Sequence, residues 1–295
     1  MHVIVTADDF GLDLAINEAV ETAFDGGLLT AASLMVGQPA ARDAVRRAHR
    51  LIGLRVGLHV TLTGARPVLP PGRIPELVDA SGRFPTRLPA LGVRLAVSRA
   101  ARRQADDEIR AQFEAFAATG LTLDHANAHQ HFHLHPYVLD RIVTIGREFG
   151  LPAVRLPFEP LWLARDVPAS AAQARRLPAL AWAVGACWMR RRLRRAGLAC
   201  NDYLFGLRCT GQLDEATLCA ALGKLRSGVA ELYLHPATRC GPNELAAGVG
   251  LRATEELAAL MSPAARSRLQ ALAVSVGGFL DIPDRTPAAH PAQAA

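Results

Sequence analysis

Short apolar segments alternate with longer stretches of helical periodicity along most of this 295-residue chain. Buried strands of a parallel sheet are short apolar runs, whereas the helices that cover such a sheet repeat apolar residues three and four positions apart. The predicted strands are 3–6, 32–36, 56–62, 121–124, 153–156 and 230–234. The predicted helices are 14–25, 40–51, 99–119, 137–149, 214–226 and 254–260. This order predicts an α/β fold with a mostly parallel sheet, either open or closed into a barrel.

The alternation extends over residues 1–285, which we interpret as a single domain. Half of the chain is apolar and a fifth is charged, so a sizeable core is expected. The segment 67–89 is rich in proline and glycine and is expected to be a loop over one face rather than a linker. Residues 286–295 are rich in proline and alanine, which predicts a disordered tail.

The charged residues argue against two classes of protein. The 33 basic and 27 acidic residues leave a net charge of +6, spread over the chain without an aromatic platform, so nucleic-acid binding is not expected. The single lysine, Lys224, stands in Gly223-Lys224-Leu225 with no serine or threonine after it. A phosphate-binding P-loop is therefore excluded.

The cysteines and the first residues predict a cytoplasmic protein. The five cysteines include no Cys-x-x-Cys pair and their number is odd, so no disulfide framework is expected. No basic segment followed by a long apolar run precedes Asp8, which argues against a signal peptide. The longest apolar stretch, 177–189, contains Pro178 and is too short to span a bilayer.

Side chains that can bind a metal or move a proton follow several predicted strands. They are Asp8 and Asp9 after the first strand, His59 in the third, five histidines within 125–135 (His125, His129, His131, His133 and His135), and His235 after the last strand. The carboxyl ends of parallel strands form one face, so we expect these groups to meet there. One carboxylate and two imidazoles leave open positions on a divalent ion, and a second carboxylate and a further histidine could move protons.

Each of these residues also has an ordinary structural interpretation. Asp8 and Asp9 suit the N-cap and first turn of a helix. His59 could be a hydrogen-bonded core histidine. The histidine run could be an exposed loop that binds metal adventitiously, and at most one or two of its members can reach a single ion. The occurrence of all these groups at strand ends favours a functional site.

Four motifs resemble the YdjC-like carbohydrate deacetylases. They are Thr6-Ala7-Asp8-Asp9-Phe10-Gly11, Gly57-Leu58-His59, Ala128-His129-Gln130-His131-Phe132-His133 and Leu234-His235-Pro236. They follow the family's order from residue 2 to about residue 280, and the chain most resembles the hopanoid-biosynthesis-associated members. The resemblance implies a distorted TIM-like (β/α) barrel.

The resemblance also implies residue roles. Asp9, His59 and His129 would bind one divalent ion, zinc or magnesium. Asp8 would be the general base, His235 the general acid, and Arg155 would lie near the base. The chain departs from the family at Asn127-Ala128, where Asp-Ser is frequent, and Asp124 is offset by three positions. This departure leaves the histidine ligand within 125–133 open, although the Gln130-His131-x-His133 context favours His129.

The implied activity is hydrolysis of the acetamide of an N-acetylglucosaminyl group, which is a C–N bond other than a peptide bond. The expected substrate is a hopanoid glycolipid. The alternatives are soluble N-acetylated chito-oligosaccharides, or a non-catalytic role as a metal- or membrane-binding protein. Asp8 and His235 argue against the last, because a structural metal site needs neither. A homo-oligomer is left open.

The segment 179–195 ends in Arg190-Arg191-Arg192-Leu193-Arg194-Arg195. On a helix, Trp182, Ala186, Met189 and Leu193 form one apolar stripe. This pattern indicates either an ordinary amphipathic helix with a solvated basic face or a helix lying on an anionic membrane. The second interpretation would suit a lipid substrate and would place the protein peripherally at the inner membrane.

Overall fold

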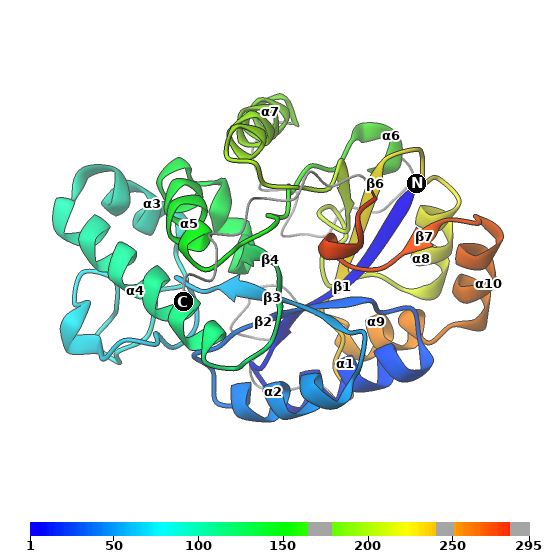
Figure 1. Ribbon diagram of the computed structural model, residues 1–295, viewed down its shortest axis with the longest axis horizontal. Coiled ribbons are helices and arrows are strands. Elements are labelled where there is room, and N and C mark those ends of the chain that lie inside the picture. Colours follow the sequence, from blue (N-terminus) through cyan, green and yellow to red (C-terminus); the bar gives the residue numbers. More distant parts are fainter. Residues whose placement is uncertain (165–178, 240–250, 284–295) are drawn as a thin grey trace, which may run out of the picture.

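The computed structural model describes residues 1–164, 179–239 and 251–283. The predicted tail 286–295 and Cys240 lie outside these ranges. A curled parallel sheet runs through the molecule with helices packed around it (Figure 1). The strand order is β4-β3-β2-β1-β6-β5, and the short β7 pairs with β1.

The strands are β1 (His2–Phe10), β2 (Ala31–Leu34), β3 (Arg55–Val60), β4 (Leu123–Ala128), β5 (Tyr203–Phe205), β6 (Val229–Leu234) and β7 (Ser275–Val276). The α-helices are α1 (Leu14–Gly26), α2 (Ala41–Arg50), α3 (Leu88–Val97), α4 (Arg99–Ala117), α5 (Pro136–Glu148), α6 (Leu161–Ala164), α7 (Ala179–Arg195), α8 (Glu215–Leu222), α9 (Ala253–Leu260) and α10 (Pro263–Ala271). Short 3₁₀ turns are η1 (Pro71–Arg73), η2 (His129–Leu134) and η4 (Phe279–Asp281).

The strand β1 is the centre of the core. All nine of its residues are buried, because β2 and β6 pair with it on either side and the faces of the sheet are covered. The helix α1 packs on β1 and α4 packs on β3, while α5 lies on α4 and α8 contacts both α9 and α10. The predicted α/β class with a parallel sheet is confirmed.

The prediction of a regular strand over 153–156 is wrong. Val154 makes a single bridge to Ala126 in β4, and Ala153 makes another to Ala199. Pro152 and Pro157 flank this stretch and lack the N–H that a strand ladder needs. The segment nevertheless fills the space between β4 and β5, since Ala126 N donates to Ala153 O (2.9 Å) and Leu204 N donates to Phe158 O (2.7 Å).

Several elements differ from the sequence-based expectation. The helices α3 and α10 and the strand β5 were not predicted, and β5 has three residues, too few for a recognisable pattern. The strand β4 continues past Asp124 to Ala128. His125 and Asn127 are therefore strand residues whose side chains point to the same side.

Among the described residues, none of the helices combines the length and the apolar character that crossing a bilayer would require.

Candidate metal centre and active site

The end of β1 brings two adjacent carboxylates into one site. Regular alternation along a strand would send neighbouring side chains to opposite faces. Here the pairing of β1 with β2 changes register between Ala7 and Phe10, and Asp9 has a left-handed φ of 64°. Both Asp8 and Asp9 are buried. Left-handed backbone conformations in residues other than glycine are uncommon and cluster at functional sites.

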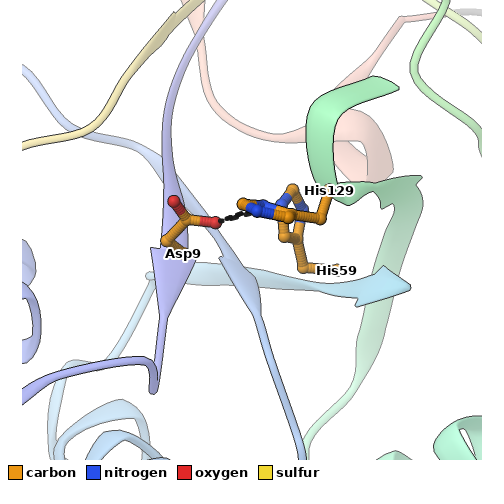
Figure 2. A group of neighbouring side chains, drawn as sticks. All are labelled: Asp9, His59 and His129. Carbon is orange, nitrogen blue, oxygen red and sulfur yellow. Dashed lines mark hydrogen bonds and ion pairs between the residues drawn. The ribbon is translucent and has the colours of Figure 1, made fainter. Parts of the chain in front are cut away.

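His59 and His129 point towards Asp9 from two other elements (Figure 2). His59 lies in β3 and His129 begins η2, directly after β4. Asp9 Oδ1 is 3.2 Å from His59 Nε2 and 3.0 Å from His129 Nδ1. One ligand atom from each of the three side chains lies within 4.8 Å of the others. One carboxylate and two imidazoles gathered in this way form a donor set of the kind that binds a divalent ion such as zinc.

The chemistry of this group fits a divalent cation. Burial alone would raise the pKa of Asp9, but His129 and His59 beside it hold that pKa well below its ordinary value, so the carboxylate stays charged. The ring of His59 is oriented by Asn127, whose Oδ1 accepts from His59 Nδ1 at 2.6 Å. The other ring nitrogen, Nε2, thus faces the carboxylate, as a metal-binding histidine requires.

Asp8 is held by a buried arginine. Arg155 Nη1 donates to Asp8 Oδ2 at 2.5 Å, while its Nε and Nη2 donate to Glu231 Oε1 at 2.9 and 2.8 Å. Burial raises the pKa of Asp8, but Arg155 and the nearby His59 and His235 lower it far below the usual range. Asp8 is therefore ionised and fixed in place. Its Oδ1 accepts a longer bond of 3.2 Å from Asn127 Nδ2.

His235 directly follows β6, which pairs with β1 on the side opposite β2 and β3. Its side chain is 15 % exposed, and Nδ1 is 4.0 Å from Glu256 Oε2. Glu256 is fully buried and also accepts from the backbone N–H of His235 (2.6 Å) and of Leu213 (3.2 Å). The hydrogen bond from the backbone N–H of His235 to this buried carboxyl group fixes the chain at the point where the imidazole enters the site.

The other histidines of the run 125–135 have different surroundings. His125 and His133 are fully buried, and each uses both ring nitrogens in hydrogen bonds. The ring of His131 packs edge-on against Tyr233, with centroids 5.0 Å apart, and His135 packs against Phe132 at 5.7 Å. Of the described histidines in this run, His129 is the one grouped with Asp9 and His59.

Sequence reasoning missed four polar residues that build the site. They are Ser33, Asn127, Glu231 and Glu256, all completely buried. Glu231 carried a usable signal, because a charged residue inside an apolar strand needs a buried partner, and Arg155 is that partner. Asn127 appeared in the sequence as a departure from the family, whereas the structure places its amide between His59 and Asp8.

The fold and the site define an α/β protein with a candidate metal centre at the carboxyl ends of a parallel sheet. The chain belongs to the YdjC-like protein family, whose family model matches residues 2–271.

Curated relatives agree with this placement. The chain is 38 % identical over 165 residues to a carbohydrate deacetylase of Geobacillus stearothermophilus, which covers 56 % of this chain and 61 % of that protein. It is 25 % identical over 236 residues to a carbohydrate deacetylase of Thermoanaerobacter pseudethanolicus, covering 80 % and 81 %. The match with the first relative thus spans about three fifths of that protein's length.

A solved structure shows the same fold. It is that of an Enterococcus faecalis V583 protein described as a candidate cellobiose-phosphate cleavage protein, with a TM-score of 0.73 and 20 % identity. The superposition covers 95 % of this chain and 97 % of that one. Nearly the whole chain therefore follows a fold already known.

Proposed function

We propose that this protein is a metal-dependent carbohydrate deacetylase that hydrolyses the acetamide of an N-acetylated sugar. The observation that carries the proposal is the convergence of Asp9, His59 and His129 beside the ionised Asp8. The family membership and the relatives described as carbohydrate deacetylases support it. Amide hydrolysis needs a base that deprotonates water, a positive group that stabilises the oxyanion and an acid that protonates the leaving amine. The arrangement offers Asp8 as the base, a metal site for the oxyanion and His235 as the acid.

The chain's own residues have distinct tasks in this reaction. A bound divalent ion would polarise the acetamide carbonyl and lower the pKa of a water. Asp8 Oδ1 would accept the proton of the attacking water as the new C–O bond forms at the acetamide carbon. His235 donates a proton to the nitrogen as the C–N bond breaks, so that acetate and a free amino sugar leave. Arg155 keeps Asp8 charged and aimed at the water.

We propose a lipid-linked substrate on the character of α7, and an N-acetylglucosaminyl hopanoid within that class on the resemblance to the hopanoid-biosynthesis-associated members. The stripe of Ala186, Met189 and Leu193 is buried and faces the protein, as in an ordinary amphipathic helix. A second face carries the exposed Val184 and Trp188, followed at helical spacing by the exposed Arg191 and Arg195. Apolar side chains next to arginines suit an anionic bilayer surface.

The activity is tested by incubating the purified, metal-loaded protein with three N-acetylated compounds. They are an N-acetylglucosaminyl lipid in vesicles, N-acetylated chitobiose in solution, and an N-acetylated peptide as the control. We expect acetate release from the lipid above all, less from chitobiose and none from the peptide. Faster release from chitobiose would assign the substrate to soluble oligosaccharides. No release from any compound would leave the chain a non-catalytic binding protein.

Metal dependence has its own test. Dialysis against a strong chelator should abolish acetate release, and added Zn²⁺ should restore it. His59→Ala and His129→Ala should each lower the bound metal measured by elemental analysis, because each removes one of three donors. The exposed His49 provides the matched control, and His49→Ala should keep the metal content of the wild type. Full metal content in the His59 and His129 variants would contradict the ligand assignment.

A further inference from the structure

A second polar cluster lies inside the sheet, directly behind the candidate metal centre. Asp124, His125 and Ser33 are each fully buried. His125 Nδ1 is 2.8 Å from Asp124 Oδ2, and His125 Nε2 is 3.1 Å from Ser33 Oγ. Ser33 Oγ is in turn 2.9 Å from Asn127 Nδ2. A continuous chain of hydrogen bonds thus leads from Asp124 to the residue that orients His59.

The backbone of β3 makes room for this chain. His125 in β4 must cross β3 to reach Ser33 in β2, and it crosses at Gly57, the register partner of Ser33. A Cβ at Gly57 would lie 2.4–2.5 Å from three atoms of the His125 ring. No residue other than glycine fits there while the ring keeps its place, so the sequence accommodates the crossing at a strand position where glycine is otherwise unfavourable.

The direction of each hydrogen bond follows from its neighbour. The Asp124 carboxylate accepts from the backbone N–H of Phe279 (3.0 Å) and of Leu280 (2.8 Å), and it also accepts the Nδ1 proton of His125. The Nε2 of His125 is then an acceptor, so the Ser33 hydroxyl donates to it. The oxygen of Ser33 remains free to accept a proton from the amide of Asn127.

The same order continues to the metal centre. Because Asn127 Nδ2 donates to Ser33 Oγ and to Asp8 Oδ1, its Oδ1 must face His59. That oxygen accepts the Nδ1 proton of His59, so Nε2 is the ring nitrogen that faces Asp9 and would bind the metal. A flipped amide would present N–H groups to His59 Nδ1 and would favour the tautomer that cannot bind a metal through Nε2.

Aspartate, histidine and serine in this order also form the nucleophilic triad of serine hydrolases. Burial argues against that role here, since none of the three residues has any exposed surface and a substrate carbonyl cannot approach Ser33 Oγ. The hydroxyl is also already engaged by the Asn127 amide.

We propose that Asp124, His125 and Ser33 form a positioning relay that fixes the amide orientation of Asn127 and thereby the metal-binding tautomer of His59. The inference rests on the proposed function, because it assigns a task within the same metal centre. None of the three is a catalytic residue, since they act through Asn127.

The experiment compares Ser33→Ala with Thr30→Val. Thr30 precedes the same strand, and its hydroxyl bonds only the backbone of Val5 among the interactions described, so its loss is a matched change away from the site. Zn²⁺ affinity is measured by competition with a chelator. In the Zn²⁺-loaded protein with ¹⁵N-labelled histidine, the Nδ1–H resonance of His59 is followed by NMR and assigned with His59→Ala.

For Ser33→Ala we expect the Kd for Zn²⁺ to rise about tenfold, the usual effect of losing an outer-shell partner, and the His59 Nδ1–H resonance to weaken or move. Ser33→Thr keeps the hydroxyl and should retain an affinity closer to that of the wild type. Asp124→Asn, a second variant at the far end of the relay, should shift both readouts in the direction of Ser33→Ala. Thr30→Val should change neither.

Wild-type affinity and an unchanged His59 resonance in Ser33→Ala would overturn the proposal. Covalent labelling of Ser33 by a fluorophosphonate would also overturn it, because the residue would then be an accessible nucleophile. These readouts do not depend on acetate release. Failure of the protein to deacetylate any sugar would therefore reject the proposed function without deciding the relay, which the Zn²⁺ and NMR measurements decide.

Discussion

The two adjacent aspartates at the end of β1 differ in their partners rather than in their burial. Asp8 faces the guanidinium of Arg155, whereas Asp9 faces the imidazoles of His59 and His129. Asp8→Asn should keep the metal but lower turnover by about 10²–10⁴-fold, the usual contribution of a general base. Asp9→Asn should instead weaken metal binding. Elemental analysis measures the metal content of both variants, and steady-state kinetics measures their turnover. An exchange of the two behaviours would reverse the assigned roles.

His133 predicts a dependence of stability on pH. Its Nδ1 accepts from Ala128 N (3.1 Å) and its Nε2 donates to Arg155 O (3.1 Å), so the neutral ring is the form that fits. Burial and the nearby Arg155 lower the pKa of His133 from 6.5 to about 3. Between pH 6.5 and about 3, His133 therefore binds a proton in the unfolded chain but not in the folded chain. The contribution of the neutral His133 ring to the free energy of unfolding is complete above pH 6.5. It is lost as the pH falls towards 3, by up to about 1.4 kcal/mol per pH unit.

The measurement is urea unfolding at pH 7.5 and pH 5.5 in the presence of a chelator. The wild type should lose more free energy of unfolding between these two values than His133→Gln does. The exposed His49 offers a control, and His49→Gln should follow the wild type. Equal losses in the wild type and His133→Gln would show that another group is responsible for the acid sensitivity.

At the scale of elements, the sequence predicted the helices and strands that have a regular apolar pattern. It missed the elements that depend on contacts between residues far apart in the chain. Apolar periodicity located β1, α1, α4 and β6 because their burial follows a regular pattern. It could not show that β4 extends beyond Asp124 through His125 and Asn127, since buried polar residues in a strand are stable only when hydrogen-bond partners satisfy them. The roles of Asp9, His59 and His129 came from the family resemblance, and their proximity from the structure.

The helix α7 gives a prediction at the same scale. Arg190 pairs with Asp202 and Arg192 with Asp140, so these two arginines are bound within the protein. The exposed arginines 191, 194 and 195 are available for anionic lipid. Replacing these three by Gln should reduce co-sedimentation with anionic vesicles and raise the apparent KM for a vesicle-embedded substrate, with chitobiose turnover unchanged. Wild-type binding should also weaken with salt, because exposed charges are screened over about 10 Å at 0.1 M.

A matched variant controls for the change in net charge. Arg42, Arg99 and Arg103 are exposed on α2 and α4, and replacing all three by Gln removes the same charge from other surfaces. This variant should bind vesicles like the wild type. Equal loss of binding in both triple variants would mean that overall charge, and not the face of α7, attracts the protein to lipid. Unchanged binding in the α7 variant would remove the argument for a lipid-linked substrate.

At the scale of the whole molecule, the two ends of the sheet have different tasks. The candidate site lies at the carboxyl ends of β1, β3 and β6, whereas the amino ends are covered by residues 278–281. There Phe279 is fully buried against Ile4, Ala31 and Ala153. In parallel α/β barrels the amino ends of the strands serve stability, while the loops at the carboxyl ends carry the chemistry. The relay from Asp124 to Asn127 is the connection between the two ends.

This separation predicts how the covering segment responds to mutation. Phe279→Ala removes a buried ring from the core and should lower the free energy of unfolding by about 3–5 kcal/mol. Asp281→Asn breaks a partly exposed ion pair with Arg55 and should cost no more than about 1 kcal/mol. Chemical denaturation of both variants measures the difference. The Phe279 ring also packs against the His125 ring, with centroids 4.8 Å apart, but Asp124 is held by backbone N–H groups that neither substitution removes. The Zn²⁺ affinity of both folded variants should therefore stay close to that of the wild type. A loss of affinity in Phe279→Ala as large as in Ser33→Ala would show instead that the side-chain packing at the amino ends, as well as the hydrogen-bond relay, sets the geometry of the metal centre.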